Sequence, residues 1–121
     1  MNKIKTIISI CLFSILIISC TKTLNHKTKV KDIREKEIIV LRKTPSQKSI
    51  HAIAINISGT IKGKSEISLM LGNKKYLTNE LTNNFSFKWN PEWYADTAKI
   101  IYNPINVQNG NVTIRYEFED I

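Results

Sequence analysis

Two groups of carboxylates are the side chains in this sequence best suited to acid–base chemistry. Glu92 and Asp96 lie four positions apart, and Glu117, Glu119 and Asp120 crowd the C-terminus. Hydrolysis by paired carboxylates requires two acids held at a fixed separation. Glu117 and Glu119 instead alternate with apolar residues, a pattern typical of the solvated face of a strand. We therefore predict no catalytic residue in either group.

Metal and nucleophile chemistry have no better support. The histidines, His26 and His51, have no neighbour in sequence at ligand spacing. A Ser-His-Asp set is not credible without nucleophile-elbow glycines, and glycine-rich phosphate loops are missing. We expect a protein that is not an enzyme and that has no metal site and no cofactor. A small envelope hydrolase is the least favoured alternative.

Four aromatic residues fall close together: Trp89, Trp93, Tyr94 and Tyr102. Exposed side by side, Trp93, Tyr94 and Tyr102 would form a platform for a sugar ring or an apolar partner, because aromatic faces offer a large contact area at low entropic cost. The competing interpretation places Trp89 and Trp93 in the core, since a small domain needs large side chains inside. For Tyr94 the sequence favours neither the exposed nor the core interpretation.

The first residues have the layout of an export signal. Lys3 and Lys5 precede an apolar run over residues 7–18, which matches the charged and apolar regions of a secretory leader. A bilayer-spanning helix needs about 20 apolar residues, so an uncleaved anchor helix is the weaker alternative.

The leader ends in Leu-Ile-Ile-Ser19-Cys20, which resembles the lipobox of bacterial lipoproteins. The resemblance implies cleavage between Ser19 and Cys20, and acylation of Cys20 with diacylglyceryl and palmitate-type chains. Cys11 would leave with the leader, so Cys20 would otherwise be a lone exported thiol. Membrane lipid is then the expected partner, because two or three acyl chains anchor a protein essentially permanently.

The positive charge lies beside the expected anchor. The whole chain has a formal charge of +8, but residues 49–121 contain equal numbers of basic and acidic residues. Nucleic-acid binding is therefore not expected, because the domain has no basic excess. Residues 20–36 read as a flexible basic linker, either a solvated spacer or a segment attracted to anionic head groups. The absence of acids just after Cys20 favours the periplasmic face of the outer membrane.

Beyond the linker the hydrophobic pattern has a period of two, which predicts strands. Gly63, Gly72-Asn73, Asn83-Asn84, Asn90-Pro91 and Asn109-Gly110 supply turn signals between them. The sequence thus predicts an all-β domain over residues 37–121, a small antiparallel β-sandwich of six or seven strands. The expected strands cover residues 37–42, 53–57, 67–71, 74–77, 85–89, 98–102 and 112–118.

The body also resembles small β-sandwich lipoproteins of Bacteroidetes-type envelopes. The resemblance covers about residues 50–121 and rests on a Ser-Gly-x-Ile-x-Gly hairpin, a Trp-Tyr-x-Asp segment and the final Val-x-Ile-x-Tyr-x-Phe strand. It implies a fold and a compartment but no activity. Asp96-Thr97-Ala98 further resembles an O-glycosylation acceptor of such envelopes, with Thr97 as the modified residue; in the alternative, Asp96 caps a turn.

These observations favour a lipid-anchored envelope lipoprotein with a non-catalytic binding or structural domain. Its partner would be an envelope protein or glycan. The alternative is an accessory or inhibitor protein that docks a secreted partner through an exposed edge strand.

Overall fold

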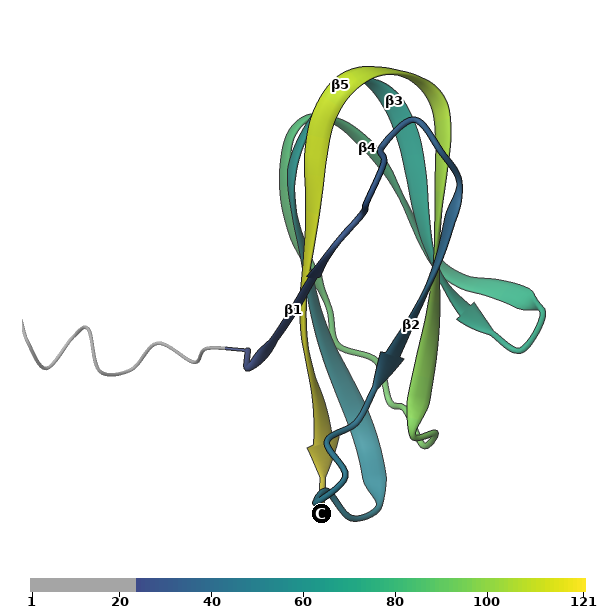
Figure 1. Cartoon of the computed structure of the whole chain (residues 1–121). Coiled ribbons are helices and arrows are strands. Elements are labelled where there is room, and N and C mark those ends of the chain that lie inside the picture. The colour runs from purple at the N-terminus through teal and green to yellow at the C-terminus, as the bar shows by residue number, and fades with distance from the viewer. Residues whose placement is uncertain (1–23) are drawn as a thin grey trace, which may run out of the picture.

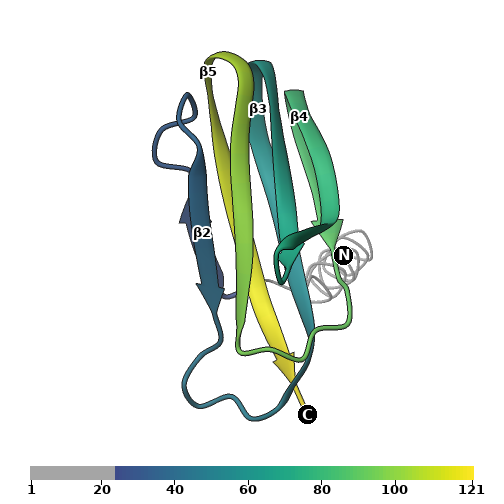
Figure 2. The ribbon, with the colours of Figure 1, turned by 90° about the vertical axis from the view of Figure 1, so that its right-hand side faces the viewer.

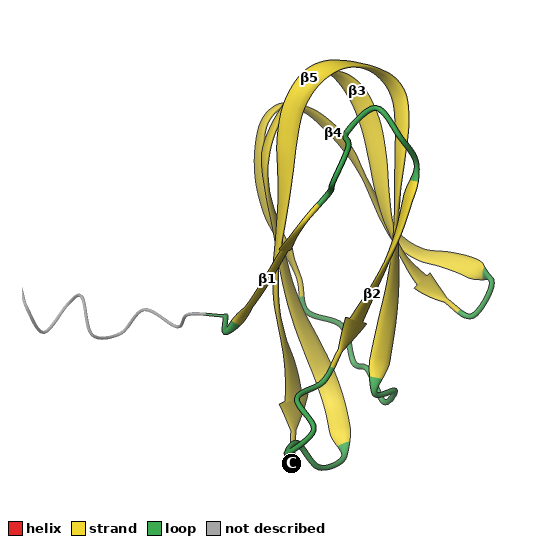
Figure 3. Ribbon diagram, in the orientation of Figure 1, coloured by secondary structure: helices red, strands yellow, loops and turns green. Residues whose placement is uncertain are grey.

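The computed structural model describes residues 24–121, which form one antiparallel five-stranded sheet (Figures 1 and 3). The sequence-based predictions for Ser19 and Cys20 lie outside these residues. The prediction of an all-β, antiparallel fold is confirmed. The strands are β1 (His26–Lys29), β2 (Glu37–Arg42), β3 (Ile50–Leu71), β4 (Lys74–Trp89) and β5 (Thr97–Asp120).

Strands β3, β4 and β5 are long, and all three curve over at one end of the molecule (Figures 1 and 2). Around Ile57, the neighbours of β3 are Phe87 and Ile114, from the C-terminal halves of β4 and β5. Around Ile67, the neighbours are Asn79 and Tyr102, from the N-terminal halves. Each long strand therefore contributes one segment to each half of a folded sheet.

The short strands complete the two halves at one side. β1 pairs with the C-terminal half of β5, with His26 opposite Tyr116. β2 pairs with the N-terminal half of β5, with Ile39 opposite Ile100. Each half of the sheet thus has four strand segments.

Side chains from both halves meet in one core. Ile55 and Ile57 of the first half of β3 and Ile67 and Leu69 of the second half are fully buried in the same cluster. β-Branched and aromatic side chains pack well on a pleated surface, and burying one such side chain contributes about 1.5–3 kcal/mol. The core is what joins the two halves.

Glycines allow the sheet to bend. Gly63 of β3 and Gly110 of β5 have φ angles of +119° and +143°. A Cβ on Gly63 would overlap the carbonyl oxygen of Asn106, and one on Gly110 would overlap that of Thr60. The β3–β5 register also shifts on either side of the Gly63–Lys64 pair, and such bulges bend a strand and increase its twist.

All seven segments predicted as strands lie within β2 to β5. Some of the turns expected between them are absent, because the strand continues through the predicted turn residues. β3 continues from Ile50 to Leu71 through Gly63, and β5 continues through Asn103-Pro104 and Asn109-Gly110. These turn residues bend the strands without ending them, because a bulge changes direction while the ladder resumes beyond it.

The predicted flexible linker over residues 20–36 is wrong in its second part. Residues 26–29 form β1 in the sheet, and Val30 is buried. The His26 and Tyr116 rings stack at a centroid distance of 5.1 Å, and Ile33 packs against the core. The basic composition concealed this strand. Lys27 and Lys29 are exposed, while the residues that alternate with them, His26 and Thr28, are half-buried.

We expect Gly63→Ala to lower the free energy of unfolding by more than about 2 kcal/mol, because the new methyl group meets backbone in a conformation that alanine disfavours. Denaturant unfolding of the purified protein measures the change. Gly72→Ala is the control: Gly72 also has a positive φ, of +63°, but its Cβ would meet open space, so a loss of about 1 kcal/mol is expected. Equal losses in the two variants would contradict this account of the bend.

Candidate functional site

The structure separates the predicted aromatic group into core and surface residues. Trp89, Trp93 and Tyr102 are all buried. The Tyr102 hydroxyl donates a 2.6 Å hydrogen bond to the carbonyl oxygen of Ile33, and burial raises its pKa. The core interpretation is confirmed for Trp89 and Trp93, and the contact role predicted for Tyr102 is wrong, because its ring is enclosed. Tyr94 is 73% exposed.

The segment between β4 and β5 that carries Trp93 and Tyr94 is fixed to the start of β3. The amide of Ile53 donates to the carbonyl of Pro91 at 3.2 Å, and the amide of Trp93 donates to the carbonyl of His51 at 3.1 Å. The indole Nε1 of Trp93 donates to the carbonyl of Thr97 at 3.0 Å. These bonds hold the indole in one orientation, with only 6% of the residue's surface exposed.

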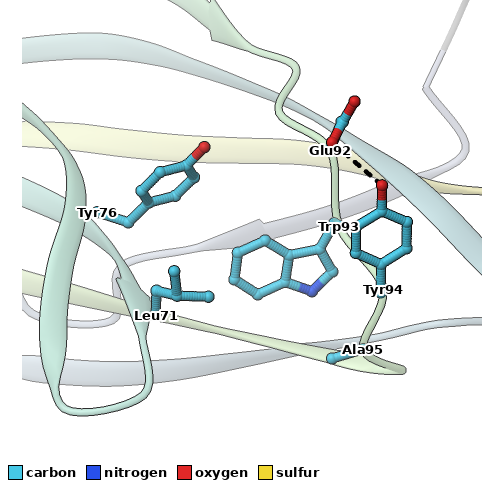
Figure 4. Close-up of a pocket in the computed structure, with 6 residues that line it drawn as sticks. All are labelled: Leu71, Tyr76, Glu92, Trp93, Tyr94 and Ala95. Atoms are coloured by element: carbon cyan, nitrogen blue, oxygen red, sulfur yellow. Dashed lines mark hydrogen bonds between the residues drawn. The ribbon is translucent and has the colours of Figure 1, made fainter.

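An open hollow of ≈ 510 Å³ lies beside this indole. Figure 4 shows Tyr76 and Leu71 on one side of Trp93 and Tyr94 on the other. Leu71 is 56% exposed and Tyr76 is 47% exposed. Large apolar side chains gathered at one exposed place are characteristic of interaction sites. The lining residues are Leu71, Tyr76, Glu92, Trp93, Tyr94 and Ala95.

Leu71 and Tyr76 belong to the hairpin that joins β3 to β4. The pairs Leu69–Leu77 and Met70–Lys75 leave Tyr76 without a partner in β3, so Tyr76 is the extra residue of a bulge. The sequence pattern does not single out either residue as a site candidate, because both continue the alternation of the neighbouring strands. One feature of the sequence could have indicated them: bulky apolar residues flank the Gly-Asn turn, and the ends of strands beside a turn extend past the core.

Glu92 supplies the negative charge of the hollow. The hydroxyl of Tyr94 donates to Oε2 of Glu92 at 3.1 Å. This hydrogen bond and the nearby carboxylate charge raise the pKa of the Tyr94 phenol above its ordinary value of 10.0. The carboxylate is therefore held at the rim of an otherwise aromatic and aliphatic surface.

A second, smaller hollow of ≈ 330 Å³ shares Leu71, Trp93 and Ala95 with the first. Thr97 and Lys99, at the start of β5, also line it. Thr97 is exposed and pairs with Arg42 of β2. Its modification stays a prediction.

The other candidate residues make separate contacts. Asp96 lies 3.5 Å from the Nζ of Lys43. The carboxylate of Asp120 accepts a 2.9 Å hydrogen bond from the amide of Lys48, which lowers its pKa. Glu117 accepts from the amide of Asn25 at 3.2 Å.

The two histidines have different surroundings. Nε2 of His26 is 3.0 Å from the hydroxyl of Thr44, and the side chain of His51 is exposed. Within residues 24–121, no three His, Cys, Asp or Glu side chains form a group suited to a metal ion. The same part of the chain includes no helix of the length and apolarity required to cross a bilayer.

Comparison with known proteins supports the fold. No protein-family model matches the chain, and no curated protein matches its sequence. Among solved structures, the crystal structure of PirA is similar, with a TM-score of 0.52 over 80% of this chain and 96% of that chain. The identity is 16%, so the likeness concerns the arrangement of the strands.

We expect Glu92→Gln to shift the pKa of Tyr94 downward, toward 10.0, because the variant removes the neighbouring negative charge. A pH titration of the tyrosine Cζ resonances by NMR measures this shift. Tyr116 is the internal control, since its raised pKa arises from burial and stays the same in the variant. An unchanged Tyr94 titration would contradict the Glu92–Tyr94 contact.

Proposed function

We propose that this chain is a lipid-anchored envelope lipoprotein whose β domain is a non-catalytic binding module. The anchor is proposed from the lipobox-like segment ending at Cys20. The contact site is proposed from one observation, the hollow beside Trp93 with Leu71, Tyr76 and Tyr94 exposed around it. An envelope protein or glycan is the proposed partner, on the periplasmic side of the outer membrane.

Two physical features support a binding role for the hollow. The buried Trp93 is fixed by hydrogen bonds at both backbone and ring, so the segment that presents Tyr94 loses little conformational entropy when a ligand binds. Its rim exposes apolar surface that a partner would remove from water, at about 25 cal/mol per Å². We further infer that the folded sheet is a small sandwich, with the two halves as its layers.

The alternative function, docking of a secreted partner through an edge strand, is favoured by β2. Within residues 24–121, β2 pairs with β5 alone. Its outward side chains Ile38 and Val40 are 59% and 44% exposed. An added strand could pair with this edge while its side chains cover the two apolar residues.

We expect Cys20→Ala to abolish incorporation of radiolabelled palmitate into the protein and to leave the leader uncleaved or the protein soluble. The reason is that the thiol is the proposed attachment atom for diacylglyceryl. Fluorography and intact-mass spectrometry of the purified chain measure both effects. Cys11→Ala is the matched control and should label normally. Unchanged labelling of Cys20→Ala would refute the anchor.

We expect Tyr94→Ala to weaken binding of the purified, lipidated protein to delipidated envelope fractions by about fivefold or more, since truncating an aromatic anchor typically costs more than 1 kcal/mol. Sedimentation with a fluorescently labelled protein measures the binding. Ile105→Ala is the control, because Ile105 is also apolar and exposed but does not line the hollow. A loss seen only with Val40→Lys would favour the edge of β2 instead.

A further inference from the structure

The lining of the main hollow has an unusual balance of chemical groups. Two exposed aromatic side chains, Tyr76 and Tyr94, lie on either side of the buried Trp93 and line the hollow together with one carboxylate, that of Glu92 (Figure 4). The lining includes no basic side chain. Aromatic faces carry negative quadrupole density, so they attract cations, and the carboxylate adds to this attraction. The hollow is thus complementary to positive charge in a chain that is itself basic.

The hydrogen-bonding capacity of the hollow restricts which cation fits. A lysine ammonium has three donors and an arginine guanidinium has five, whereas the charged acceptor here is Glu92, one of whose oxygens already accepts from Tyr94. A desolvated donor without an acceptor is costly. A quaternary ammonium has no donor to satisfy, and its methyl groups match apolar walls.

The neighbouring hollow supplies the opposite charge. Lys99 and the hydroxyl-bearing Thr97 line it, together with Asn73 of the β3–β4 turn. Because Leu71, Trp93 and Ala95 belong to both hollows, the two hollows are adjacent, and the lining of one includes a carboxylate while that of the other includes an ammonium. A zwitterionic ligand that spans the two hollows would complement both charges.

We infer that this double hollow binds a phosphocholine group, with the trimethylammonium in the main hollow beside Tyr76, Tyr94 and Glu92 and the phosphate toward Lys99. The inference rests on the proposed binding function of the hollow and names its ligand chemistry. Phosphocholine can occur as a free solute or as the head group of a lipid, and the chemistry of recognition is the same.

The test uses the lipidated full-length protein in a polyoxyethylene detergent, which carries neither sugar nor choline. Isothermal titration with choline, phosphocholine and 3,3-dimethylbutanol, the uncharged isostere of choline, separates charge from shape. We expect phosphocholine to bind more tightly than choline, and the isostere to bind at least about fivefold more weakly than choline.

Two pairs of variants assign the ends of the ligand. Glu92→Gln should weaken choline and phosphocholine alike, while Glu80→Gln, which removes a surface carboxylate paired with Lys64, should weaken neither. Lys99→Ala should bring phosphocholine down to the affinity of choline and leave choline unchanged. Lys88→Ala, on the exposed face of β4, should have no effect.

The source of the group is decided with short-chain lipids, because the acyl chains proposed on Cys20 would carry the protein into any vesicle. Isothermal titration in the same detergent with dihexanoyl-phosphatidylcholine, compared with dihexanoyl-phosphatidylglycerol, identifies a head-group site if binding requires the choline lipid and is reduced by Tyr94→Ala. Binding of free phosphocholine without binding of the choline lipid identifies a solute site. Either result supports the inference.

Other results would overturn it. Equal binding of choline and its uncharged isostere, unaffected by Glu92→Gln, would leave an apolar hollow and remove the charge argument. No binding of any choline compound, with envelope binding still lost in Tyr94→Ala, would remove the phosphocholine inference and retain the proposed function. Loss of neither kind of binding in Tyr94→Ala would remove both.

Discussion

Where β3 and β5 bend over together, each strand brings a backbone carbonyl oxygen close to a glycine of the other. The oxygen of Asn106 approaches Gly63, and the oxygen of Thr60 approaches Gly110. That close approach leaves no room for a side chain at Gly63 or Gly110. Because the bend is made within continuous strands, the ladder of main-chain hydrogen bonds resumes on both sides of it, and few polar groups lose their partners. The two halves of the sheet can then bury Ile55, Ile57, Ile67 and Leu69 in one core.

The same bend accounts for the position of the double hollow. Strands that are long enough to serve both halves extend beyond the core at their far ends, and the β3–β4 hairpin carries Leu71 and Tyr76 into solvent. The β4–β5 segment crosses beside it and is bound to the start of β3 through Pro91 and Trp93. The aromatic surface therefore forms where two chain reversals meet, on backbone that hydrogen bonds hold in place.

Alternating hydrophobicity made the strands predictable. Each segment with bulky residues at every second position lies in a strand, and in 53–57 the alternate isoleucines are all buried. The pattern did not reveal β1, because a strand at the side of the sheet buries few residues and its lysines dominate the composition. Gly63 was predicted to end a strand, but it bends one. The hydrophobic pattern could not show this, because the bend depends on pairing with β5, which is distant in sequence.

Residue types and their spacing were sufficient for the strand period and the core role of Trp89, because each depends on a short stretch of chain. The chemical character of Trp93, Tyr94 and Tyr102 was equally clear, but their exposure was not. Tyr102 lies in the core and Tyr94 at the surface because packing between the halves of the sheet encloses one and leaves the other outside. Leu71, Tyr76 and Glu92 joined the site for the same reason: chain segments that no local pattern connects are brought together by the fold.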